Sequence, residues 1–297
     1  MKKLRLTTKA LIALLLLLCL VTGCNQQKTG ANPGDAADVP AQAYLTIKGD
    51  GVERETGYSL EDLKGMGSLL AESCYSTVNN WPVKKFYVAR GASVIGLLEK
   101  AGLKEEARAI CFIAADGYKA TLTREQLEET RYCYPGLLQD SREGALEAPV
   151  LLAWEYLEDS SYLSEAVAGK LRLFVGQIGL NDMVTASYVK NVVTVEALTT
   201  APGQWDAVEA IPAPGPVERG AGVELSHPTQ DLVRIYYTID GSPPDPHNGI
   251  VYNPSATYFQ PELNKPVEIT EDLTVKAYAT GFGKEDSPIA EFTYRVK

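Results

Sequence analysis

The chain has 297 residues, a formal net charge of −10, five cysteines and two histidines, and 45% of its residues are apolar. This composition is typical of globular proteins and excludes a fibrous or disordered chain, and the length predicts about two domains. The negative charge argues against nucleic acid as a partner because phosphates would be repelled, and two histidines argue against a histidine-rich metal site.

The N-terminal segment has the pattern of an export signal. Met1–Lys9 is basic, and Ala10–Val21 is an apolar run too short to span a bilayer but typical of a signal peptide core. The next residues, Val21-Thr22-Gly23-Cys24, resemble the lipobox of bacterial lipoproteins. The resemblance implies that residues 1–23 are removed, changing the net charge from −10 to −14, and that Cys24 is lipidated. The protein would then be anchored to the cell membrane and face outside the cytoplasm; a plain secretory signal with an incidental cysteine is the alternative.

Two low-complexity segments divide the remaining chain. Residues 24–40 are polar and predict a flexible tether, and the Pro- and Gly-rich residues 201–216 predict a linker. They separate a domain over residues 41–200 from a domain over residues 217–297. Beyond Cys24, an exported chain would keep three thiols, which allow at most one intramolecular disulfide. These thiols are Cys74, Cys111 and Cys133, of which Cys111 lies in an apolar run and is expected to be buried.

Residues 41–200 mix strand and helix patterns, and this mixture predicts an α+β fold. Ser59 is expected to cap a short helix, as is Thr123, which forms a capping box with Gln126. The acidic runs Glu125–Glu129 and Glu155–Asp159 are interpreted as solvated faces. A further helix is predicted over Ser93–Ala101, and strands are predicted over Ala43–Lys48, Ala109–Ala115, Pro149–Trp154, Leu171–Val175 and Val189–Leu198.

An ordered series of short motifs runs through this first domain. Gly91 opens the helix that ends at Ala101-Gly102, and it is followed by Asp116-Gly117-Tyr118, Pro149–Ala153, Gly169–Leu173 and Tyr188-Val189-Lys190. The series resembles the oxidoreductase molybdopterin-binding domain of the sulfite oxidase type. The resemblance covers residues 44–198 and implies a sulfite-oxidase-like α+β fold with a molybdopterin cofactor.

The same resemblance implies roles for three residues. Cys74 occupies roughly the place of the family's cysteine thiolate, which ligates molybdenum, and Arg172 and Lys190 match positions that help to hold the cofactor. The family's pattern has His and Pro on either side of Gly169, where this chain has Ala and Lys, and residues 24–200 contain no histidine. Two functions stay open: a molybdopterin-dependent oxidoreductase, or a cofactor-free ligand-binding or adhesion lipoprotein of the cell envelope.

Residues 217–297 carry strand and turn patterns with almost no helix signal. The motifs Tyr236–Pro244 and Ile269–Ala277 resemble the C-terminal domain of chitobiases and β-hexosaminidases, which is an immunoglobulin- or fibronectin-III-like fold without an active site. We therefore expect a small all-β sandwich. Its strands are predicted over Arg234–Ile239, Val267–Thr270, Leu273–Thr280 and Glu291–Val296.

Overall fold

The computed structural model describes residues 43–79, 83–257 and 262–297. The expected signal peptide, Cys24 and the expected tether lie outside the described residues. All described residues belong to one compact unit. Within it, one hydrophobic core is built from buried residues between Leu45 and Ala197, and a second from buried residues between Trp205 and Tyr294. In the described part of the chain, no helix has the length and apolar character needed to cross a membrane.

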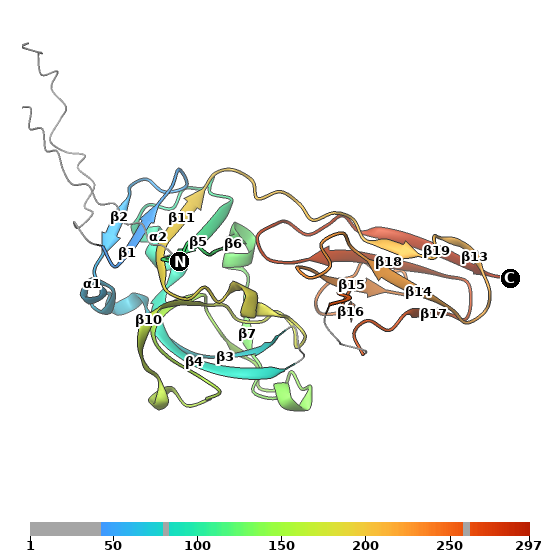
Figure 1. Ribbon diagram of the computed structural model, residues 1–297, viewed down its shortest axis with the longest axis horizontal. Helices are drawn as coiled ribbons and strands as arrows, with labels where there is room; N and C mark the ends of the chain where they lie inside the picture. Colours follow the sequence, from blue (N-terminus) through green and yellow to red (C-terminus); the bar gives the residue numbers. More distant parts are fainter. Residues whose placement is uncertain (1–42, 80–82, 258–261) are drawn as a thin grey trace, which may run out of the picture. The chain divides into compact units, whose positions relative to one another are not determined.

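The first core lies beside a five-stranded sheet in the order β2-β1-β11-β5-β6, in which only β1 and β11 run parallel (Figure 1). Strands predicted over residues 43–48, 109–115 and 189–198 are confirmed as β1, β5 and β11, because their buried side chains follow the expected apolar pattern. The strands are β1 (Leu45–Lys48), β2 (Thr56–Tyr58), β5 (Ala109–Ala114), β6 (Lys119–Thr123) and β11 (Val192–Leu198).

A second sheet is wholly antiparallel, in the order β10-β9-β4-β3. The sequence did not predict the long β3–β4 pair, and it placed Gly91 at the start of a helix. Gly91 instead lies in β4 at a bulge, where a Cβ atom would come within 2.1 Å of the Leu152 carbonyl oxygen. The strands are β3 (Leu70–Val78), β4 (Lys84–Ser93), β9 (Leu151–Glu158) and β10 (Val167–Phe174), with a small separate pair of β7 (Tyr132–Cys133) and β8 (Leu146–Glu147).

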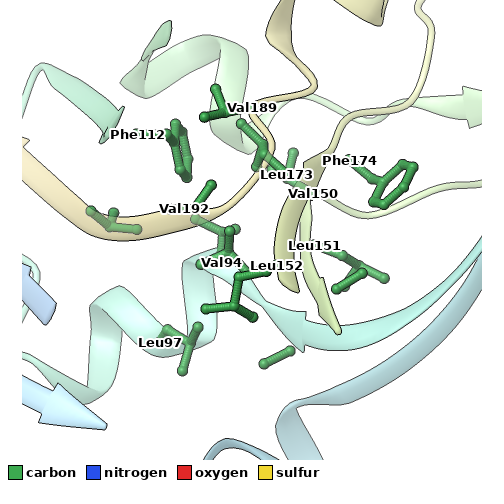
Figure 2. Packing of buried hydrophobic residues seen from close by; sticks show 14 of the residues in the cluster. Val94, Leu97, Phe112, Val150, Leu151, Leu152, Leu173, Phe174, Val189 and Val192 are labelled. Atoms are coloured by element: carbon green, nitrogen blue, oxygen red, sulfur yellow. The ribbon is translucent and has the colours of Figure 1, made fainter. Parts of the chain in front are cut away.

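The helices are short, so the α+β prediction is only partly correct and strands dominate this part of the chain. Both predicted N-caps are confirmed: Ser59 forms a capping box with Asp62, and Thr123 forms one with Gln126. Figure 2 shows side chains of α2 gathered with those of β5, β9, β10 and β11 in the first core. The helices are α1 (Leu60–Lys64), α2 (Val94–Lys100) and α3 (Arg124–Glu128), with 3₁₀ turns η1 (Gly67–Leu69), η2 (Leu137–Gln139), η3 (Leu163–Glu165) and η4 (Val184–Ser187).

The C-terminal residues form two sheets around the second core, which confirms the predicted all-β sandwich. The sheet orders are β12-β14-β17 and β13-β19-β18-β15-β16. The expected linker is more structured than predicted, because Trp205 and Val208 are buried in this core and β12 lies within residues 201–216. The strands are β12 (Glu209–Ile211), β13 (Gly215–Val217), β14 (Ala221–Ser226), β15 (Arg234–Thr238), β16 (Ile250–Tyr252), β17 (Val267–Ile269), β18 (Leu273–Thr280) and β19 (Ala290–Val296).

Candidate functional site

Cys74 lies in β3, half-buried, and its thiol donates a hydrogen bond to the Ser161 carbonyl oxygen at 3.4 Å. Burial raises the pKa of the Cys74 thiol. Cys74, Cys111 and Cys133 are all free, and Cys111 is buried as expected. Burial also raises the pKa of Cys133 to about 11. Both thiols are therefore protonated near neutral pH in the protein without a metal.

Arg172 lies in β10 with only 7% of its surface exposed. Its guanidinium carbon is 5.1–5.7 Å from the ring centroids of Tyr87, Phe174, Tyr156 and Tyr188. Among the described residues, its Nε atom is buried without a hydrogen-bond partner. Aromatic rings therefore occupy the space around the guanidinium that a cofactor phosphate would need.

Lys190 lies directly across the backbone from Arg172, because the two residues form an isolated antiparallel bridge. The nearby Leu173 amide donates to the Val189 carbonyl oxygen at 2.9 Å, which fixes the approach of the two segments. The Lys190 side chain is exposed, whereas the Arg172 side chain is buried. The fold thus joins these two predicted residues through their backbones while their side chains lie in different environments.

Cys74 and Arg172 face opposite sides of the second sheet. Tyr75 pairs with Tyr87 across β3 and β4, and the Tyr87 ring lies against the Arg172 guanidinium. Because successive strand residues alternate between faces, Cys74 points away from Tyr75 and toward Ser161 on the other face.

The two residues are also separated within the sheet. β3 and β10 are its two edge strands, with β4 and β9 between them, so roughly 14 Å separates their axes at ordinary strand spacing. A cofactor ligated by the Cys74 sulfur would have to pass around or through the sheet to reach the Arg172 guanidinium. These residues do not fit the single molybdopterin site that the family resemblance implies.

A different part of the structure contains a cavity of about 380 Å³. Cys74, Arg172 and Lys190 do not line it. Its walls come from α3 and the residues after it, the segment before η4, β15, and the turn that follows β18. The charged residues in its lining are Glu125, Glu129, Arg131, Asp182, Arg234, Lys284, Glu285 and Asp286.

Arg131 is the central cation of this cavity and is 4% exposed. Its guanidinium pairs with the Glu129 carboxylate, lies 3.5 Å from an Asp182 carboxylate oxygen, and donates to the Gly176 carbonyl oxygen at 3.0 Å. Its guanidinium carbon also lies 5.2 Å from the centroid of the Phe282 ring. These contacts bring together residues from the two sequence halves.

Desolvation changes the titration of several charged groups in the cavity. Burial raises the pKa of Glu129 to about 7, despite the opposing effect of Arg131. Burial also raises the pKa values of Asp182 and Asp286, and it lowers the pKa of Arg234 to about 10. The predicted solvated face is found at the exposed Glu125 and Glu128, but Glu129 is only partly solvated, with 32% of its side chain exposed, and contacts Arg131.

Gln126 holds one wall of the cavity in place. Its Oε1 accepts hydrogen bonds from the Thr123 amide and the Gly283 amide, each at 3.1 Å. Its Nε2 donates to the carbonyl oxygens of Gly281 at 2.8 Å and Lys284 at 3.3 Å. The sequence pattern identified the capping bond to Thr123, but it contained no signal for the three bonds to residues 281–284.

One protein-family match covers part of the C-terminal domain. Residues 223–294 match the protein family described as Fn3 associated. No curated protein sequence matches the chain.

Two solved structures show distant similarity. The sulfane dehydrogenase SoxCD from Paracoccus pantotrophus has 15% sequence identity and a TM-score of 0.33, over 82% of this chain and 68% of that chain. The fibronectin(III)-like modules of Clostridium thermocellum CbhA have 10% identity and a TM-score of 0.24, over 77% of this chain and 94% of those modules. At these TM-scores, neither likeness assigns an activity to this chain.

Proposed function

We propose that the protein is a lipid-anchored, extracytoplasmic binding protein of a bacterial cell envelope. In this proposal, the first domain resembles the sulfite-oxidase-type fold but works without the molybdopterin cofactor. The observation that carries the proposal is the placement of Cys74 and Arg172 on opposite faces of the second sheet. The alternative, a molybdopterin-dependent oxidoreductase, would need both residues at one site.

The chemistry of the two residues also favours the binding function. The Cys74 thiol donates a hydrogen bond to the Ser161 carbonyl oxygen, on the face of the sheet opposite to Arg172. A phosphate-binding arginine must offer its N–H groups to the ligand, whereas four aromatic rings surround Arg172.

The cavity supplies a place for a ligand. Its volume of about 380 Å³ lies within the usual range for small-molecule sites, roughly 300–1,000 Å³. Arg234, Tyr236 and Phe282 from the C-terminal residues line it together with Glu129 and Asp182. The proposal therefore gives the C-terminal domain a part in forming the site, in addition to any role as a spacer.

Metal analysis tests the cofactor-free state. The full-length protein is produced in a host that makes molybdopterin, and molybdenum is measured by mass spectrometry in wild type, Cys74→Ser and the control Cys111→Ser. We expect all three proteins to be equally free of stoichiometric molybdenum. One molybdenum per chain that is lost in Cys74→Ser and kept in Cys111→Ser would overturn the proposal in favour of the oxidoreductase.

Lipid labelling tests the anchor. Cells are grown with an alkyne-bearing palmitate, and the incorporated label is compared between wild type and Cys24→Ala. We expect label and membrane association in wild type and neither in the variant, because acyl chains contribute roughly 0.8 kcal/mol per buried CH₂ to anchoring. A membrane-free, unlabelled wild-type protein would contradict lipidation at Cys24.

A further inference from the structure

We propose that the cavity binds a small organic cation: a protonated amine with an apolar body, whose ammonium group lies between Glu125, Glu129 and Asp286. This inference rests on the proposed binding function and specifies the chemical class of its ligand. The argument comes from the cavity's charge balance, from the pairing of its charged groups, and from its apolar wall.

The cavity contains more negative than positive groups. Five carboxylates line it against three cationic side chains. All three cations already have partners within the protein. Arg131 pairs with Glu129 and Asp182, the buried Arg234 donates to the Asn253 amide oxygen at 2.7 Å, and the Lys284 ammonium lies 4.6 Å from the Trp205 ring centroid.

Among the five carboxylates, Glu125 and Asp286 lack such an ion pair in the described part of the chain, whereas Glu129 already pairs with Arg131. Within residues 43–79, 83–257 and 262–297, no cationic side chain forms an ion pair with Glu125 or Asp286. Burial is the main cause of the raised pKa values of Asp286 and Glu129. The charge of Glu125 raises the pKa of Asp286 further, and the charge of Asp286 raises the pKa of Glu129 further. All three carboxylates line the cavity, and the charge of Asp286 opposes the ionisation of Glu129 as that of Glu125 opposes the ionisation of Asp286. A cation bound among them would offset this repulsion.

The rest of the lining is suited to an apolar body. Aliphatic and aromatic side chains from both halves of the sequence form this wall: Ile178, Met183, Leu232, Val233 and Phe282. A bare metal ion or ammonium ion would leave this surface uncovered. An amine with an attached hydrocarbon or aromatic group would bury it, at roughly 25 cal/mol per Å² of apolar surface.

Three probes of similar size and different charge distinguish the ligand classes. Binding of phenethylamine, 2-phenylethanol and 3-phenylpropanoate to the full chain is measured by calorimetry above about pH 8, where a carboxyl with a pKa near 7 is ionised. We expect phenethylamine to bind and the neutral and anionic probes to bind at least tenfold more weakly. Glu129→Gln and Asp286→Asn should each weaken amine binding about tenfold, which corresponds to about 1.4 kcal/mol.

The control variant is Glu106→Gln, an exposed carboxylate outside the cavity, which should bind phenethylamine like wild type. Melting temperatures of all variants separate loss of binding from loss of folding. Tighter binding of 3-phenylpropanoate than of phenethylamine would overturn the inference and assign the cavity to anions. Absence of amine binding at about 5 mM, in protein free of molybdenum, would also overturn it while leaving the cofactor-free proposal intact. Stoichiometric molybdenum would instead refute the proposed function.

Discussion

Replacement of Gln126 by alanine should destabilise the protein through contacts that are far apart in the sequence. The side chain accepts from the amides of Thr123 and Gly283 and donates to the carbonyl oxygens of Gly281 and Lys284. Alanine removes all four bonds, and it leaves the turn after β18 without its partner on α3.

The expected loss follows from these bonds. A typical intramolecular hydrogen bond contributes about 0.5–1.5 kcal/mol net. The partly exposed position lets water replace some of them. We therefore expect Gln126→Ala to lower the free energy of unfolding by about 2–4 kcal/mol. For a chain of this size, the melting temperature should fall by roughly 5–10 °C.

Urea unfolding, followed by tryptophan fluorescence and circular dichroism, measures the change. Gln126→Glu is the matched control, because a carboxylate at this position still accepts from Thr123 and Gly283 but cannot donate to Gly281 and Lys284. It should therefore show an intermediate loss. If Gln126→Ala changes the free energy of unfolding by less than about 0.5 kcal/mol, these contacts contribute little and the reasoning is refuted.

Three further predictions concern Glu129, Arg172 and Gly91. The folded pKa of Glu129 is about 7, against 4.5 for an ordinary glutamate, so the folded state binds more protons in this interval and stability should fall as pH rises through it. Glu129→Gln should make that fall shallower in urea titrations at several pH values; an unchanged slope would contradict the assignment. The free energy of unfolding of Arg172→Met should stay within about 1 kcal/mol of wild type, because an apolar side chain packs well among the four aromatic rings. Arg172→Ala should lower it by roughly 3 kcal/mol. Equal losses in the two variants would show that the guanidinium itself is needed. Gly91→Ala should lower the free energy of unfolding by about 3 kcal/mol or more, because its Cβ would clash with Leu152. Gly117→Ala, at a position with positive φ and open space around it, should lower it by about 1–2 kcal/mol. Thermal unfolding measures both changes. A similar loss in both would count against the clash.

Features that depend only on residues close together along the chain could be predicted from the sequence. The capping boxes at Ser59 and Thr123 require only a side chain and an amide three positions apart, so their pattern is readable without tertiary contacts. The strands β1, β5 and β18 could also be predicted from the sequence, because their apolar and β-branched residues indicate an extended, buried segment.

The tertiary structure alone decided the candidate sites. Whether Cys74 and Arg172 could share a ligand depended on strand order and register, since a shift of one residue exchanges the faces of a strand. The β3–β4 pair that sets this register was not predicted, because its sequence mixes polar and apolar residues on both faces.

The cavity depended even more on long-range packing. Glu129 belongs to an acidic run that, as a sequence, predicts a solvated face. Its raised pKa results from desolvation and from charges such as Asp286, which lies more than 150 residues away along the chain. The sequence by itself thus determined the caps, several strands and the all-β character of the C-terminal domain. Only the packing of distant segments decided which charges are desolvated together, because desolvation depends on every atom nearby, whatever its place in the chain.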